Sequence, residues 1–189
     1  MLGDCLNADR VIRVQGATTT SAAVPIIVNA LPTATITSPA SGTVVQAPGS
    51  VTLTATAADS DGTITKVDFY QGATLVGAAT ASPYTANVTG LAAGTYSFTA
   101  VATDNNNATT TSAAVSVRVN AAPTVSLTSP TSGTVYNAPA TVNLAATAND
   151  TDGTIAKVEF FQGATLVGTA SSSPYTATVA GLASSSYSF

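Results

Sequence analysis

Three aspartates in two polar loops are the residues of this chain that could hold a cation. Asp59 and Asp61 lie in the run Asp-Ser-Asp-Gly-Thr-Ile, and Asp104 begins the run Asp-Asn-Asn-Asn. Carboxylate and loop carbonyl oxygens are the ligands that Ca²⁺ prefers, so these residues form a calcium site if the fold brings both loops to one end. In the alternative interpretation, Asp61-Gly62 is a turn that Asp59 caps through the backbone. The turn is favoured, and no metal or other cofactor is predicted.

Few other side chains of the chain support catalysis. Its 189 residues include no His and a single Cys, Cys5. This excludes His-based dyads and triads as well as zinc sites built from imidazoles or paired thiolates. Glycoside hydrolysis needs a carboxylic acid with a raised pKa inside a cleft, whereas Asp59 and Asp61 occupy a short polar loop. We therefore predict no catalytic residues and no enzymatic activity.

Lysine and an acidic residue recur two positions apart, as Lys66 with Asp68 and as Lys157 with Glu159. At this spacing both side chains lie on one face of a strand, and we expect a solvated ion pair on an outward face. An isopeptide cross-link from Lys66 to an Asp or Asn is the alternative, but it requires a buried Lys. The solvated pair is favoured.

Charge and aromatic content narrow the choice of partners. Five Lys and Arg against nine Asp and Glu give a net charge of −4, and charged residues make up 7% of the chain. Nucleic acids and anionic membranes attract basic proteins, so neither is an expected partner, and no transmembrane segment is predicted. Carbohydrate binding uses exposed flat aromatics. Trp is absent, and only Tyr70 and Phe161 are expected to face outward, so surface glycans are a weaker candidate ligand.

The chain repeats itself every 91 residues. Residues Asn29–Phe98 align without a gap on Asn120–Phe189, and the run Gln-Gly-Ala-Thr-Leu-Val-Gly recurs unchanged at 71–77 and 162–168. Apolar residues alternate with polar ones in short runs between Gly, Pro and Asn turns, which is typical of strands with one buried face. The inward positions are expected to be Val51, Leu53 and Ala55; Val67 and Phe69; Tyr96, Phe98 and Ala100; and Val115, Val117 and Val119. About seven such strands per repeat predict an all-β fold of antiparallel two-sheet sandwiches.

The repeat carries several motifs of one known family. These are Thr-Ser-Pro at 37–39, Ala-Asp-Ser-Asp-Gly-Thr-Ile at 58–64, Ser-Pro-Tyr at 82–84 and Leu-Ala-Ala-Gly-Thr-Tyr-Ser-Phe at 91–98. From Ala17 to Phe189 the chain resembles the bacterial Ig-like repeat family. The resemblance implies tandem immunoglobulin-like β-sandwiches in a secreted or cell-surface protein. The Leu91–Tyr96 stretch also resembles a tyrosine corner, in which the Tyr hydroxyl bonds back to the preceding loop.

The repeat frame is offset from the chain. Residues 29–119 form one complete repeat, and residues 120–189 form a second that lacks the counterparts of its last strands. Residues 1–28 hold a segment, Ala17–Val28, that matches the end of a repeat: Ala17–Asn29 and Ala108–Asn120 are identical at 10 of 13 positions. In the same frame Phe189 is the counterpart of Phe98, and Ala8 is that of Thr99. Short proline-containing joints between repeats predict stiff connections.

Two explanations fit this offset. The chain is a window on a longer tandem array, or the N-terminal segment of one copy completes the second repeat of the next copy by strand addition. The residues expected in that contact are Val24, Pro25, Ile26, Ile27, Val28 and Phe189. We predict an extracellular or cell-surface filament or stalk subunit that binds copies of itself head to tail. The alternative is a spacer or glycan-binding accessory module of a secreted polysaccharide hydrolase or adhesin.

Overall fold

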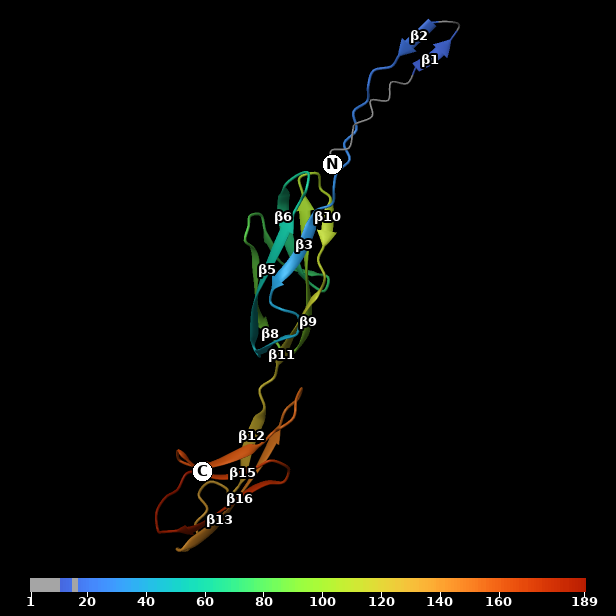
Figure 1. Ribbon diagram of the computed structural model, residues 1–189. Helices are drawn as coiled ribbons and strands as arrows, with labels where there is room; N and C mark the ends of the chain where they lie inside the picture. Colours follow the sequence, from blue (N-terminus) through green and yellow to red (C-terminus); the bar gives the residue numbers. More distant parts are fainter. Residues whose placement is uncertain (1–10, 15–16) are drawn as a thin grey trace. The chain divides into compact units, whose positions relative to one another are not determined.

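The computed structural model describes residues 11–14 and 17–189, and these residues form strands, turns and irregular segments without a helix. The chain divides into two units, Met1–Ala30 and Leu31–Phe189. In the first unit, β1 (Val11–Val14) and β2 (Ala17–Thr20) form an antiparallel hairpin, and residues 21–30 have no regular secondary structure (Figure 1). Cys5 lies outside the described residues.

The first repeat folds into a sandwich of two sheets, as predicted (Figure 1). One sheet has the order β3-β5-β8 and the other the order β4-β11-β9-β6-β7, with β10 paired to β9. The strands are β3 (Thr33–Ser38), β4 (Thr43–Gln46), β5 (Gly49–Ala58), β6 (Ile64–Gln71), β7 (Thr74–Ala79), β8 (Tyr84–Leu91), β9 (Gly94–Asp104), β10 (Thr109–Thr111) and β11 (Val115–Asn120).

The alternation of apolar and polar residues determines which face of each strand is buried. On β5, Val51, Leu53 and Ala55 are buried while the intervening threonines point outward. Phe69 and Phe98 are fully buried and are the bulkiest side chains at the centre of the core. The rest of that core consists of small residues, which lets the two sheets pack closely.

Close packing of the sheets also explains one recurring glycine. A Cβ on Gly77 of β7 would lie 2.5 Å from the Cβ of Ala86 on β8, and a Cβ on Gly168 would clash with Ala177 in the same way. No side chain fits at either position unless the sheets move apart. The unchanged run at 71–77 and 162–168 therefore ends on a residue that the packing requires.

The first repeat contains more strands than the seven expected. The first edge strand is divided into β3 and β4, which belong to different sheets: β3 pairs with β5, and β4 pairs in parallel with β11. The Ser38–Gly42 stretch between them contains Pro39, which lacks an amide donor, and Gly42, whose φ of 87° favours glycine. A turn there carries the chain from one sheet to the other.

The second repeat forms a smaller set of sheets, β12-β13-β16 and β14-β15. Its strands are β12 (Thr124–Ser129), β13 (Ala140–Asn149), β14 (Val158–Gln162), β15 (Thr165–Ala170) and β16 (Tyr175–Leu182). Val142, Leu144, Val158 and Phe160 form its buried core. Of the described strands, β14 pairs only with β15, whereas its counterpart β6 pairs with both β7 and β9.

A tyrosine corner is present in both repeats. Tyr96 Oη donates to the carbonyl oxygen of Ala92 at 3.0 Å, and Tyr187 Oη donates to that of Ala183 at 3.2 Å. The hydroxyl thereby fastens the loop that precedes each final segment. Replacing Gly94 with Ser185 in the second copy does not remove this bond.

Candidate functional site

The two aspartate-bearing loops lie together at one end of the first sandwich. Thr63 donates its amide to Oδ1 of Asn105 at 2.8 Å, and the Asn105 amide donates to the carbonyl oxygen of Thr63 at 2.9 Å. These bonds join the loop that follows β5 to the loop that follows β9. Asp59, Asp61 and Asp104 are therefore brought close to one another, as the calcium hypothesis requires.

The three carboxylates have different surroundings. Asp104 is fully buried, and its Oδ1 accepts the amides of Asn106 at 2.8 Å and Ala108 at 2.9 Å, so it holds the turn between β9 and β10. Both carboxylate oxygens of Asp59 are buried, and neither accepts a well-formed hydrogen bond from the described residues. Burial raises the pKa of Asp59, and the neighbouring Asp61 and Asp104 carboxylates raise it further, while the Asp61 backbone amide offsets part of the rise.

The described residues contain no group of three or more His, Cys, Asp or Glu side chains arranged to hold a metal ion. One of the three carboxylates, Asp104, is already engaged with backbone amides. Calcium binding at Asp59, Asp61 and Asp104 stays the less favoured, untested alternative. The turn interpretation is the simpler account of these loops.

The Lys66–Asp68 pair differs from expectation. Nζ of Lys66 lies 2.6 Å from Oδ2 of Asp68, but the Asp68 side chain is only 11% exposed whereas that of Lys66 is 48% exposed. The hydrogen bond and charge of Asp68 raise the pKa of Lys66. The pair is therefore half-buried rather than solvated, because the neighbouring strands β7 and β9 flank β6 on both sides. Lys157 Nζ and Glu159 Oε1 form the more exposed pair, at 2.5 Å.

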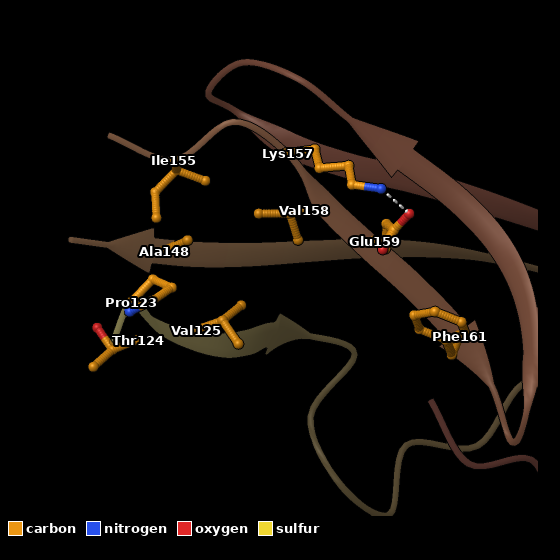
Figure 2. Close-up of a pocket in the computed structure, with 9 residues that line it drawn as sticks. All are labelled: Pro123, Thr124, Val125, Ala148, Ile155, Lys157, Val158, Glu159 and Phe161. Carbon is orange, nitrogen blue, oxygen red and sulfur yellow. Dashed lines mark hydrogen bonds and ion pairs between the residues drawn. The ribbon is translucent and has the colours of Figure 1, made fainter. Parts of the chain in front are cut away.

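The aromatic pair considered for glycan binding is only partly exposed. Tyr70 is half-buried, whereas Phe161 is 44% exposed. Phe161 lines a hollow of about 270 Å³ in the second repeat, together with Val125 of β12 and Val158 of β14 (Figure 2). A second hollow, of about 210 Å³, also contains Leu127 and Phe189.

Each hollow is on a side of the second repeat whose counterpart in the first repeat is covered by packed strands. In the first repeat, β3 packs against β9 and β10, and Ile36 is only 8% exposed. Its counterpart Leu127 is 39% exposed, and Phe189 is half-buried where Phe98 is fully buried. The hollows are therefore the open side of the second core, and they do not form an enclosed ligand pocket.

The segment expected to mediate assembly is the most exposed apolar stretch described. Val24, Ile26, Ile27 and Val28 are 81–87% exposed. Their phase matches that of Val115, Val117 and Val119, which are at most 9% exposed on β11. Pro25 lies among them in a stretch without regular secondary structure. Two closely similar segments therefore differ in burial: β11 is buried, whereas Val24–Val28 is exposed to solvent.

The joint between the repeats contains an aspartate whose role the sequence did not indicate. The backbone amide of Ala121 donates to both carboxylate oxygens of Asp152, at 3.1 and 3.2 Å. Arg118 Nη2 donates to the Asp152 carbonyl oxygen at 2.5 Å and approaches its Oδ2 at 3.4 Å. One signal was available, because Arg118 is among five basic residues and immediately precedes the joint.

No helix in the described part of the chain is long and apolar enough to cross a bilayer.

Comparisons with known proteins agree with this architecture. The model of the bacterial Ig domain family matches residues 32–100 and 123–189. No curated protein sequence matches the chain. The fibronectin(III)-like modules of Clostridium thermocellum CbhA are 34% identical over 79% of this chain and 80% of theirs, with a TM-score of 0.46.

Two further solved structures are more distant in sequence. The titin domains Z1Z2, in complex with telethonin, are 12% identical over 80% of this chain and 81% of theirs, with a TM-score of 0.39. Domains 4–9 of the surface layer protein SbsC are 18% identical over 85% of this chain and 25% of theirs, with a TM-score of 0.28. Both repeats match one family model, so the chain belongs to the bacterial Ig domain family.

Proposed function

We propose that this chain is a non-catalytic, extracellular filament or stalk subunit whose copies join head to tail by strand complementation. The segment Ala17–Val28 of one copy supplies a strand to the second repeat of the next. The observation that carries this proposal is the contrast in burial between Val24–Val28, which is bare, and its counterpart in β11, which is buried. The function rests on this assembly, and it needs no catalytic group.

The hydrophobic effect favours burial of the exposed segment Val24–Val28 against a partner. Burying an exposed Val or Ile side chain stabilises a contact by roughly 1.5–3 kcal/mol, and Val24, Ile26 and Val28 would share one face if the segment paired as a strand. An apolar strand with unpaired backbone groups readily adds to another sheet. The second repeat has an apolar surface that such a strand could cover, since its core has an open side lined by Leu127 and Phe189.

The arrangement of donor and acceptor determines the kind of assembly. The donor segment precedes the first sandwich and the acceptor is the second, so the two surfaces of a contact are different. Such a heterologous contact does not close on itself unless a rotation happens to complete a ring, and it otherwise builds an open chain of subunits. Low charge and the absence of His are compatible with a structural role outside the cell.

Sedimentation velocity and electron microscopy of the purified chain test this function. We expect concentration-dependent oligomers and thread-like particles. Replacing Val24 and Ile26 with Asp places charges on the buried face, and the double variant should weaken association at least about tenfold, because unpaired charge is costly to bury. Leu75→Asp is the matched control: Leu75 is 54% exposed on β7 and belongs to neither the donor segment nor the second repeat, so its variant should still associate.

The alternative function, a spacer or glycan-binding accessory module, predicts no self-association. A spacer or glycan-binding accessory module would stay monomeric at high concentration and would bind a polysaccharide through Phe161. Monomers that are unaffected by the Val24 and Ile26 substitutions would contradict self-assembly. Polysaccharide binding that Phe161→Ala abolishes would support the accessory module instead.

A further inference from the structure

The joint between the two repeats leaves little free chain. β11 ends at Asn120, whose carbonyl oxygen accepts the Ala47 amide at 2.9 Å and which lies beside Gln46 in the pairing with β4. Asn120 therefore belongs to the sheet of the first sandwich, although the 91-residue frame counts it as the start of the second repeat. The first strand of the second repeat, β12, begins at Thr124, so only residues 121–123 connect the two.

The first of these connecting residues is held at both of its backbone groups. The Ala121 amide donates to both carboxylate oxygens of Asp152, at 3.1 and 3.2 Å. The Ala121 carbonyl oxygen accepts a hydrogen bond from Nδ2 of Asn120 at 2.7 Å. Asp152 lies in the loop between β13 and β14 of the second repeat. A residue attached to the first sandwich is therefore followed directly by a residue attached to the second.

The same aspartate is contacted from the first sandwich. Arg118 is an exposed residue of β11, and its Nη2 donates to the carbonyl oxygen of Asp152 at 2.5 Å and lies 3.4 Å from Oδ2. These two residues are 34 positions apart and lie on opposite sides of the joint. Asp152 thus accepts donors from the last strand of one sandwich and from the chain that leads into the next.

The loop that carries Asp152 is a tight turn. The Asp152 amide donates to Oδ1 of Asp150 at 3.2 Å. A Cβ on Gly153 would lie 2.6 Å from Oδ2 of Asp150, so the turn leaves no room for a side chain at that position. Because the loop is already ordered by its own contacts, holding the joint costs it little further conformational entropy.

The two contacts at Asp152 differ in strength. Domains joined by a small interface are expected to move relative to one another, and an exposed ion pair does little to prevent this. The Arg118 and Asp152 side chains, which are 44% and 27% exposed, form such a pair. The bond from the Ala121 amide is charge-assisted, which makes it about twice as strong as a neutral hydrogen bond, and it restrains the connecting chain itself. The order of the joint is therefore expected to depend mainly on Asp152.

Proline is the alternative source of stiffness in this joint. Pro123 fixes its own φ and limits the conformation of Ala122, but Pro123 is itself exposed. A proline restrains the chain only locally. Asp152, in contrast, ties the chain to the body of the second repeat, so it can fix an orientation that proline alone leaves open.

From these contacts we infer that Asp152 is a latch that fixes the orientation of the second repeat against the first, with Arg118 as its weaker partner. Without the carboxylate, residues 121–123 become a short flexible connection. The inference goes beyond the proposed function, because it concerns a single copy and applies to a filament subunit and to a spacer alike.

Distance measurements between two spin labels by pulsed electron paramagnetic resonance test the latch. Cys5 is replaced with Ser in every variant, and Thr85→Cys and Thr176→Cys place a label at the same exposed position of each repeat. Labelled chains are diluted into excess unlabelled Cys5→Ser chain, so that only distances within one copy are measured. We expect a narrow distribution in this parent and one at least about twofold broader in Asp152→Ala, because an unrestrained linker samples many end-to-end distances.

Three matched variants separate the contributions to the joint. Asp152→Asn keeps an oxygen acceptor for the Ala121 amide and should remain close to the parent. Arg118→Ile introduces the residue type that the chain has at the counterpart position, Ile27, and should broaden the distribution less than Asp152→Ala does. Pro123→Ala should also broaden it less. Circular dichroism spectra and melting temperatures that match the parent show that both sandwiches remain folded.

The outcomes separate the latch from assembly. A distribution in Asp152→Ala as narrow as that of the parent overturns the latch, and so does broadening in Pro123→Ala that equals or exceeds it. Broadening that is greatest in Asp152→Ala and absent from Asp152→Asn supports the latch. Sedimentation of the parent tests the proposed function independently, because either result of the distance measurement is compatible with copies that associate and with copies that do not.

Discussion

Aspartates in the loops between strands perform different roles in this molecule. Asp152 accepts the Ala121 amide at the joint between the repeats, and Asp104 holds the turn after β9. Both carboxylate oxygens of Asp59 are buried without a well-formed hydrogen bond. Asp104 and Asp152 therefore stabilise the fold by accepting hydrogen bonds, whereas the buried charge of Asp59 destabilises it.

Asp59 makes the stability of the first repeat depend on pH. Its pKa in the folded protein is raised above 3.8, chiefly by burial and then by Asp61. The folded state then binds the proton more readily than the unfolded chain, so stability falls as the pH rises from 3.8 through the folded-state pKa. Asp59→Asn should raise the melting temperature at pH 7, and this gain should shrink near pH 3.5. Circular dichroism at both pH values measures it, and a lower melting temperature at pH 7 would contradict the raised pKa.

The tyrosine corner gives a second prediction at this scale. Tyr96→Phe removes the bond to Ala92 and should cost about 0.5–1.5 kcal/mol, the usual net value of a hydrogen bond. Tyr187 is 36% exposed and its bond to Ala183 is longer, so Tyr187→Phe should cost less. Urea unfolding monitored by fluorescence measures both changes. A larger loss from Tyr187→Phe would contradict this ordering.

At the scale of the element, period-two alternation was a sufficient guide to most strands. The inward positions of β5, β6, β9 and β11 were predicted correctly because burial on one face leaves that pattern in sequence. The division of β3 from β4 was missed, since both halves are extended and differ only in the sheet they join. The burial of Asp68 was missed as well, because it depends on strands that flank β6 from elsewhere in the chain.

The close approach of β7 and β8 is a feature of packing that can be tested. Gly77→Ala forces its new methyl group against Ala86 and should cost about 1–3 kcal/mol, typical of overpacking. Ala86→Gly removes the opposing methyl group, so the double variant should lose less than the two single variants combined. Chemical unfolding of all four proteins gives this coupling. Additive losses would mean that the sheets do not meet at this point.

The joint between the repeats depends on one carboxylate. Asp152→Ala removes both acceptors of the Ala121 amide, and amide hydrogen exchange at Ala121 should become several-fold faster, which corresponds to roughly 1 kcal/mol. Arg118→Ala leaves the carboxylate in place and should change this exchange little, because an exposed ion pair contributes only about 0–1 kcal/mol. Equal acceleration in both variants would mean that Arg118 protects the Ala121 amide as much as Asp152 does. Arg118 was the sequence's one signal for this joint, and the Ala121–Asp152 contact itself was not indicated, because its partners are 31 residues apart.

At the scale of the whole molecule, the sequence was most informative through its repeat frame. The 91-residue offset identified both the bare segment at Val24–Val28 and the open side of the second core, although neither motif nor composition pointed to them. What it could not supply was the exposure of that core: Leu127 is 39% exposed, whereas its counterpart Ile36 is 8% exposed.

Head-to-tail assembly should persist and strengthen in salt. The proposed contact consists of backbone pairing and apolar side chains, and each copy carries a net charge of −4 that opposes association. Raising NaCl from about 0.05 to 1 M shortens the Debye length from more than 10 Å to about 3 Å, which screens this repulsion. We therefore expect the sedimenting mass at fixed protein concentration to stay constant or increase. A fall in mass would indicate that ion pairs hold the copies together, and the acceptor would then have to lie near the charged residues of β14 rather than at the apolar side lined by Leu127 and Phe189. Running the Val24 and Ile26 double variant in parallel separates this effect from nonspecific salting-out, since only strand-mediated oligomers should be lost in that variant at both salt concentrations.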